Sequence, residues 1–311
     1  MSSQQQESIS QSEITYTLQG CESNIRSDGR ELTDIRPYEV TIGPILLSNG
    51  SARVSLPNGG TDILCSVKAE VESSSSDVGH VEVVVELLAG ANTVAGSRIA
   101  RARQEAELSK ILHKLLASAV DLKGLCIVRR KWCWKLCVDI LVVSSNGSLI
   151  DTCSLAVCAA LNSTLLPNIT SVEKIDNGGG NSSKSKATDD FLVDGDINNA
   201  VCPPGSELCP ISITVCKVGK QMLVDALPDE EICSTALVSV SVDRNGTICG
   251  VQKCGNGSLP GAQLNQIIDI SVAVAEPFFA RLKRAVKMQV MEGGVSNVAS
   301  SDLLQNYFEF N

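Results

Sequence analysis

The stretch Asn146–Leu161 is the first place where this chain could hold a small anion. Asn146-Gly147 is a tight-turn signal, and a run of small residues with helical character follows it. Backbone amides at such a turn, followed by a helix N-terminus, form a cradle for an anion. A phosphate-using site would add a basic residue, but Leu149, Ile150 and Asp151 stand here. The sequence therefore predicts the geometry of a cradle without the positive charge that phosphate needs.

A second candidate is the acidic pair Glu230-Glu231, which follows Val224-Asp225. A carboxylate at a site can bind a cation or accept a proton. Acidic residues are also routine in the first turn of a helix, where they meet the positive end of the helix dipole. We expect this second role, a solvated helix start, for Glu230 and Glu231.

A third group consists of basic residues on a predicted helix and on the turn that precedes a long strand. Positions three and four apart share one face of a helix, so this group indicates either a path for an RNA backbone or a solvated helix face beside a basic turn. Both interpretations stay open. The residues are Arg101, Arg103, Lys110, Lys114, Arg129, Arg130 and Lys131.

Metal and nucleotide motifs find little support in the sequence. The 13 cysteines contain no Cys-X-X-Cys, and His80 and His113 are the two histidines. Gly178-Gly-Gly180 lacks a preceding strand and a following Lys-Ser/Thr, so it is not a phosphate loop. We expect no bound metal and no cofactor.

Composition narrows the class of protein. The 311 residues are 43% hydrophobic and only 3% aromatic, so Val, Ile, Leu and Ala must fill the core. The net charge of −9 argues against holding nucleic acid by overall charge alone, although a local basic patch remains compatible with it. The N-terminus lacks an apolar signal region and no apolar run reaches membrane-spanning length, so we expect an intracellular protein with reduced cysteines and no membrane contact.

Periodicity predicts the elements that must position these residues. Pro57-Asn-Gly-Gly60 separates two alternating segments and indicates a β-hairpin. Trp132 and Trp134 lie on one side of a long strand together with aliphatic residues, so we expect both in the core. Pro277 predicts a kink or a break in the last helix. The predicted strands are 38–42, 52–56, 62–71, 81–87, 132–143, 211–218, 222–226, 237–243 and 247–253, and the predicted helices are 97–120, 148–161 and 261–291.

This order of elements is typical of an α+β fold with two related βα subdomains. Met1–Ser12 has the composition of a frayed tail. The pattern of strands and helices breaks between Lys174 and Asn199, where Gly178-Gly-Gly180 is followed by a Ser/Lys run and by Thr188-Asp-Asp190, which indicates a surface insertion or linker. The predicted divisions are an N-terminal tail (1–25), a first domain (26–173), an insertion or linker (174–205), a second domain (206–291) and a C-terminal tail (292–311).

Four parts of the chain resemble the RNase PH family, in the family's order. They span most of Arg26–Arg284. Within the family, Val120–Cys126, Trp132–Leu141 and Asn146–Leu161 are most similar to the ring subunits of the eukaryotic RNA exosome. The four parts are Arg26–Arg30, Gly50–Arg53 with Thr61–Lys68, the helix that ends at Val120-Asp-Leu122 before the Trp-rich strand, and Val224–Ala226 with Glu230-Glu231.

The resemblance implies an RNase PH-like fold built for phosphorolysis. Active members use inorganic phosphate to cut RNA from its 3′ end and release nucleoside diphosphates. They need a Thr-Arg pair, which by count falls at Leu149-Ile150 in this chain, and two carboxylates after a Leu-Asp strand. One acidic position falls at Glu230-Glu231. The other falls on Leu237, or on Thr235 if the count slips by two, and both of these residues are neutral. The resemblance thus implies that this site is degenerate at Leu149, Ile150, Asp151 and Leu237.

From the resemblance we expect a non-catalytic subunit of a six-membered ring that pairs with a different RNase PH-like chain. Cap proteins and a separate nuclease would complete the assembly, and single-stranded RNA, not DNA, would pass the basic residues. It would process ribosomal RNA and degrade messenger RNA in nucleus, nucleolus and cytoplasm. A phosphorolytic exoribonuclease, alone or as half of a composite site, is the first alternative. An unrelated α+β domain is the second.

Overall fold

The computed structural model describes residues 10–57, 59–91, 98–171, 191–196, 199–255 and 257–292. Its helices are α1 (Gln11–Glu22), α2 (Arg98–Ala119), α3 (Leu149–Asn162), α4 (Pro228–Cys233) and α5 (Gly261–Glu292), with a 3-10 helix at Ser206–Leu208. Its strands are β1 (Glu39–Ile42), β2 (Gly50–Ser55), β3 (Asp62–Ser73), β4 (His80–Leu87), β5 (Cys126–Val128), β6 (Trp132–Ser144), β7 (Ile169–Ser171), β8 (Phe191–Val193), β9 (Ile211–Val218), β10 (Gln221–Val224), β11 (Ala236–Val242) and β12 (Ile248–Cys254).

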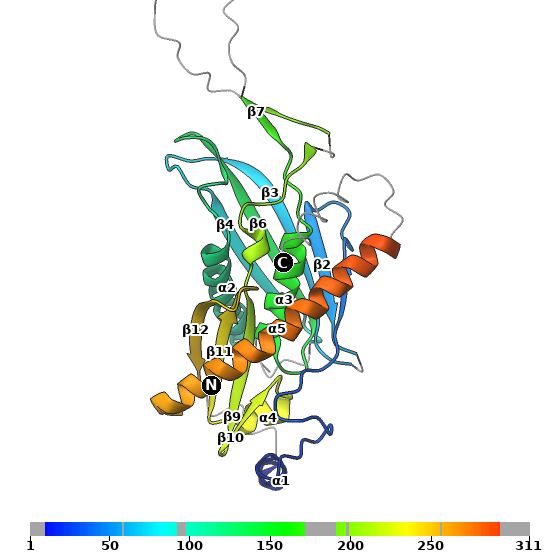
Figure 1. Ribbon diagram of the computed structural model, residues 1–311, viewed down its shortest axis with the longest axis vertical. Helices are drawn as coiled ribbons and strands as arrows, with labels where there is room; N and C mark the ends of the chain where they lie inside the picture. The colour runs from blue at the N-terminus through cyan, green and yellow to red at the C-terminus, as the bar shows by residue number, and fades with distance from the viewer. Residues whose placement is uncertain are drawn as a thin grey trace, which may run out of the picture.

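Two β-sheets form the framework, one above the other in Figure 1. The first has the strand order β1-β2-β3-β6-β4, with β5 paired to β6. The second has the order β10-β9-β11-β12, and β7 pairs with β8 in a separate ribbon. Each sheet is accompanied by helices, so the predicted α+β class with two βα units is confirmed.

The long hairpin of β2 and β3 organises the first sheet. Ile63, Cys65 and Val67 are fully buried because alternate residues of β3 point to one face. This face is covered by α2 against β4 and by α3 against β2 and β3. β4 runs parallel to β6, which requires the crossover through α2. The predicted hairpin is therefore present and forms one side of the core.

The second sheet has one apolar face and one mixed face. Ile211, Ile213 and Val215 of β9 are buried on the first, together with apolar residues of β11 and of α5. Thr214 and Cys216 alternate with them and lie on the other face. α3 contacts β9 as well as β2 and β3, so this helix lies between the two sheets.

Helix α1 occupies a segment that was expected to be part of an N-terminal tail. The side chain of Ser10 accepts a hydrogen bond from the backbone N–H of Glu13, and the Glu13 carboxylate accepts one from the backbone N–H of Ser10. This capping box satisfies free N–H groups at the start of the helix. Leu18 and Cys21 pack against a small apolar cluster of the second sheet. The helix is stabilised by this contact with residues more than 190 positions away, which local sequence patterns do not reveal.

The last helix and the two tryptophans differ in part from expectation. Of the predicted kink or break at Pro277, the break is absent, because α5 continues through that residue. Tyr38 stacks on Phe278 with ring centroids 4.9 Å apart, and its hydroxyl donates to the Phe278 carbonyl, which supports this stretch of the helix. Trp134 is buried as expected, but Trp132 is 37% exposed and meets Phe191 edge-on. Trp132 opens β6 at the end of the sheet, where no helix is seen to cover it among the described residues.

Parts of the predicted organisation lie outside the described residues. They are the first nine residues, most of the 174–205 insertion and the C-terminal tail beyond 292. The predicted domain boundaries at 26–173 and 206–291 stay predictions.

Candidate functional site at the junction of the two domains

The predicted turn at Asn146 is present and leads into α3. Gly147 and the N-cap residue Ser148 both have left-handed backbone conformations, with φ of 79° and 52°. A Cβ atom on Gly147 would collide with the carbonyl oxygen of Ala226 in the second domain. Only glycine fits here, so the cradle geometry is also a tight contact between the domains.

The anion position at this cradle is taken by the chain's own Glu231. Its Oε1 accepts a hydrogen bond of 2.7 Å from the backbone N–H of Ser148. The expectation that Glu231 is a solvated helix residue is therefore wrong. Burial raises the pKa of Glu231 to about 7, while the hydrogen bond from Ser148 acts in the opposite direction. A carboxylate occupies the place where a helix N-terminus would otherwise meet an anion.

Asp151 links the first turn of α3 to the edge of β9 by hydrogen bonds. Its two oxygens accept hydrogen bonds from the Thr214 backbone N–H (2.8 Å), the Thr214 hydroxyl (2.6 Å) and the Ser148 hydroxyl (3.0 Å). One turn later, Ser154 accepts from the backbone N–H of Ser212 at 2.9 Å. β10 pairs only with residues 215–218 of β9, so α3 side chains satisfy the N–H groups beyond that pairing. Burial raises the pKa of Asp151 to about 7 against these hydrogen bonds.

Two arginines from the segment before β1 neutralise Asp225. Arg36 binds both carboxylate oxygens, with Nε–Oδ2 of 2.9 Å and Nη2–Oδ1 of 2.6 Å, and also donates to the Asn146 carbonyl at 2.7 Å. Arg30 adds a contact of 2.9 Å to Asp225. Burial alone would raise the pKa of Asp225, but the hydrogen bonds and charge of Arg36 outweigh it and lower the pKa. Arg36 thereby connects the cradle turn to the second domain.

Glu230 is buried, contrary to expectation. Arg26 binds it through two hydrogen bonds, Nε–Oε1 of 2.9 Å and Nη2–Oε2 of 2.6 Å, with both side chains almost fully buried. Arg26 further donates to the carbonyl oxygens of Val224 and Asp225. The Glu230 carboxylate accepts from the Leu227 N–H, which caps α4. From the sequence, Arg26–Arg30 contributed only to the family resemblance. The binding of Arg26 to Glu230 of the second domain was not predicted.

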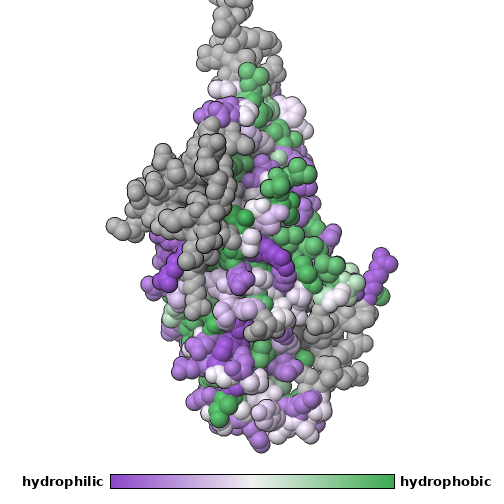
Figure 2. Space-filling model, turned by 90° about the vertical axis from the view of Figure 1, so that its right-hand side faces the viewer, coloured by the Kyte–Doolittle hydropathy of each residue, from purple (hydrophilic) through white to green (hydrophobic). Residues whose placement is uncertain are grey.

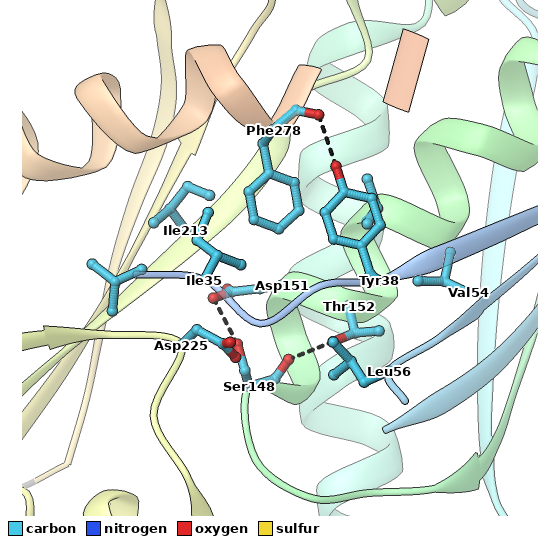
Figure 3. A pocket seen from close by; sticks show the side chains of 12 residues that line it. Ile35, Tyr38, Val54, Leu56, Ser148, Asp151, Thr152, Ile213, Asp225 and Phe278 are labelled. Atoms are coloured by element: carbon cyan, nitrogen blue, oxygen red, sulfur yellow. Dashed lines mark hydrogen bonds between the residues drawn. The ribbon is translucent and has the colours of Figure 1, made fainter. Parts of the chain in front are cut away.

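Beside this network lies a cavity of ≈ 20 Å³, with room for about one water molecule. Figure 3 shows Ser148, Asp151 and Asp225 close together at one end, with the rings of Tyr38 and Phe278 beyond them. Most other lining residues are aliphatic. The space left between the two sheets at this point is thus small and lined mainly by apolar side chains.

The residues that depart from the phosphorolytic pattern are packed apolar residues. Leu149 and Ile150 lie against the main core, half-buried. Leu237 pairs with Cys216 across the sheet and packs in the small cluster that seats Cys21 of α1. An ionised carboxylate at position 237 would be costly in this apolar setting. Leu237 therefore lies in a core contact and not in an open site.

The basic candidates divide into two groups. Arg103, Lys110 and Lys114 are exposed on α2, Arg101 is half-buried, and Arg103 pairs with Glu107 at 3.2 Å. Arg129, Arg130 and Lys131 are exposed in the turn between β5 and β6. β6 has 13 residues and leads away from this turn to Asn146, so the two ends lie roughly 40 Å apart at strand spacing. The basic turn is therefore separate from the α3 cradle.

Among the residues that the structure describes, no group of three or more His, Cys, Asp or Glu side chains is placed to hold a metal ion. Within the same residues, no helix combines the length and the apolar character needed to cross a membrane.

Comparison with known proteins agrees with this architecture. Residues 34–167 match domain 1 of the 3′ exoribonuclease family, RNase PH, and residues 209–274 match its domain 2. The chain is 32% identical over 283 residues to Exosome complex component Rrp42 of Sulfurisphaera tokodaii, covering 87% of this chain and 93% of the relative. It is also 32% identical over 272 residues to the Rrp42 protein of Methanopyrus kandleri, covering 85% and 92%.

A solved structure described as the Archaeoglobus fulgidus exosome with RNA bound to the active site has the same fold. Its TM-score is 0.69 at 24% identity, covering 86% of this chain and 97% of that chain. The names of the relatives confirm the finer resemblance carried by the sequence, to the ring subunit called exosome component 7 or ribosomal RNA-processing protein 42. Both domains, their order and most of their length are present, and the chain belongs to the RNase PH family of 3′ exoribonucleases.

Proposed function

We propose that this chain is a non-catalytic, RNase PH-like ring subunit of an RNA exosome. The observation that carries the proposal is the hydrogen bond between Glu231 and the N–H of Ser148. Phosphorolysis needs an inorganic phosphate beside the scissile bond, and a cationic side chain to stabilise the developing charge. Here a carboxylate occupies the helix N-terminus, and Leu149 and Ile150 supply no cation.

The surrounding charges support the same conclusion. Arg26, Arg30 and Arg36 lie in the same network, and each already binds Glu230 or Asp225. Releasing Arg26 to a phosphate would leave the buried carboxylate of Glu230 without its arginine, which typically costs about 3–5 kcal/mol, and releasing Arg36 would remove the two-pronged contact with Asp225. The network therefore favours a fixed junction between the domains over a site that exchanges ligands.

The surface supports a subunit role. Leu46 and Leu47 are 94% and 95% exposed at the tip of the loop between β1 and β2. The loop is held in place: Ile45 N–H donates to the Ser51 hydroxyl, and Asn49 donates to the Leu165 carbonyl and accepts from the Ala69 N–H. Hydrophobic side chains also gather on the side of the molecule shown in Figure 2. Apolar side chains presented by an ordered loop are typical of a protein–protein contact.

We propose that its partners are other RNase PH-like subunits, arranged as a heterodimer within a six-membered ring, together with cap subunits. The relatives named exosome component Rrp42 support this assignment. We further propose that the ring acts on ribosomal RNA precursors and messenger RNA in nucleus, nucleolus and cytoplasm. The basic turn Arg129–Lys131 and the exposed face of α2 would contact the RNA backbone.

The test is a phosphorolysis assay with the purified chain, alone and paired with each RNase PH-like subunit with which it co-purifies. Each sample receives single-stranded RNA and inorganic phosphate, and nucleoside diphosphates are measured. We expect none from the chain alone. Release by the chain alone would refute the non-catalytic role. Release only by a pair, and its loss when this chain carries Glu231→Ala but not when it carries Glu107→Ala, would favour the composite-site alternative.

A further inference from the structure

Two cysteines face each other across the short hairpin that carries the basic turn. β5 pairs with the start of β6 in antiparallel fashion, and Cys126 lies directly opposite Cys133. The turn Arg129–Lys131 lies between them, with a Lys131 N–H to Val128 carbonyl hydrogen bond of 3.0 Å. No other cysteines of the described strands stand in register in this way.

The hydrogen bonds define what kind of pair this is. Cys126 donates its N–H to the Lys123 carbonyl, whereas the neighbouring Trp134 donates to the Leu125 carbonyl across the ladder. Cys126 and Cys133 therefore form a non-hydrogen-bonded antiparallel pair, in which the side chains lie on the same face and the Cα atoms are about 4.5 Å apart. Disulfides need Cα separations of about 4.4–6.8 Å, so the backbone already meets this requirement.

The two thiols differ in access. Cys126 is half-buried, whereas Cys133 is fully buried between Cys126 and Glu72, its neighbour on β3. Burial raises the pKa of the Cys133 thiol, with the Ser74 side chain acting in the opposite direction. An oxidant from solvent would thus meet Cys126 first, and Cys133 would act as the resolving thiol.

We propose that Cys126 and Cys133 form a reversible disulfide when the protein meets a low-molecular-weight disulfide such as glutathione disulfide. The Cys126 thiolate attacks one sulfur of glutathione disulfide, whose S–S bond breaks and releases one glutathione thiolate. Cys133 then loses its proton and attacks the Cys126 sulfur of the mixed disulfide, releasing the second glutathione. Two protein thiols are oxidised, and one glutathione disulfide is reduced to two thiols.

The bond would close the hairpin around the basic turn. Arg130 in this turn has a left-handed backbone with φ of 60°, so the turn holds a conformation that non-glycine residues adopt less readily. A cross-link at its base removes alternative conformations of the hairpin. The sheet core on the other side of β6 would be unchanged, because Trp134 and Leu136 face away from the cysteines.

The experiment is thiol mapping on the full folded chain. The protein is equilibrated with glutathione disulfide, quenched in acid, alkylated with N-ethylmaleimide and digested with trypsin. Trypsin cuts after Lys123, Arg129, Lys131 and Lys135, so the disulfide joins two separate peptides, 124–129 and 132–135. We expect this linked pair to be the main disulfide product, and to disappear on reduction.

Three controls make the result decisive. Cys249 is exposed and has no cysteine opposite it, so it should take up glutathione without cross-linking. Cys133→Ser should convert the linked product into a stable mixed disulfide at Cys126. Cys126→Ser should leave Cys133 alkylated only after unfolding. Stable glutathione on Cys126 of the wild-type chain, or no reaction there at concentrations that modify Cys249, would overturn the proposal.

Discussion

The carboxylate of Glu231 and the backbone N–H of Ser148 meet at 2.7 Å, although they are 83 residues apart in the chain. This contact joins α4 of the second domain to the start of α3 in the first. It fills, from within the molecule, the place at which the turn and helix would present their N–H groups to an anion.

We predict that Glu231→Gln changes how stability depends on pH. The pKa of Glu231 is raised from 4.5 to about 7, so the folded chain binds a proton there more readily than the unfolded chain. The free energy of unfolding should therefore fall as the pH rises from about 4.5 to about 7, by up to about 3 kcal/mol for this group. Glutamine has no such proton to lose. Urea unfolding at pH 5.5 and 8 should show a smaller decrease for the variant, whereas parallel pH profiles would contradict the prediction.

Asp151 should be needed as a hydrogen-bond acceptor more than as a charge. Asp151→Ala would leave the buried N–H of Thr214 without its partner, at a cost of about 1–3 kcal/mol in unfolding free energy. Asp151→Asn keeps one carbonyl oxygen and should lose less. Amide hydrogen exchange at Thr214 gives a local measurement, and the exposed Asp139→Ala is the matched control. Equal exchange at Thr214 in all three variants would contradict a stabilising hydrogen bond from the Thr214 N–H to Asp151.

The buried pair of Arg26 and Glu230 should show a strong asymmetry between single and double variants. Arg26→Met leaves a buried carboxylate uncompensated and should cost about 3–5 kcal/mol. Arg26→Met combined with Glu230→Gln should recover part of that loss. Arg103→Met, in an exposed pair on α2, should cost less than about 0.5 kcal/mol. The free energy of unfolding of each variant is measured in urea. A small effect of Arg26→Met would contradict a stabilising role of the Arg26–Glu230 pair.

Leu46 and Leu47 should matter for assembly and not for folding. The double variant Leu46→Asp, Leu47→Asp should leave the melting temperature of the isolated chain unchanged, because both side chains are almost fully exposed. It should reduce co-purification with RNase PH-like partner subunits. Replacing both residues by methionine, which keeps the apolar surface, should preserve it. Normal assembly of the aspartate variant would exclude this loop from the interface.

The basic turn gives a prediction for RNA. Arg129→Glu with Arg130→Glu should weaken protection of single-stranded RNA by the assembled ring while assembly remains intact, because the charge of the exposed turn is reversed. Arg103→Glu with Lys110→Glu tests the face of α2 in the same assay. If only the second pair reduces protection, the RNA path follows α2 and not the turn.

Local patterns determined much of the secondary structure. Alternation along 62–71 and 132–143 predicted β3 and β6, because a strand with one buried face repeats every two residues. Helix α1 was missed because it buries little apolar surface of its own, although the capping box of Ser10 and Glu13 was a readable signal. The residue types along the turn also predicted a helix start at which Ile150 brings no charge.

Only the tertiary structure decided what the charged residues do. The sequence predicted that Glu230 and Glu231 lie at a helix start, and both do. In the fold, Glu230 binds Arg26, 204 residues away, and Glu231 accepts a hydrogen bond from the Ser148 N–H. Whether a carboxylate is solvated, paired or placed at another helix depends on which segments the fold brings together, and no local period encodes that. The sequence therefore predicted a helix start without a cation, and the fold showed that a carboxylate of the same chain lies at that helix start.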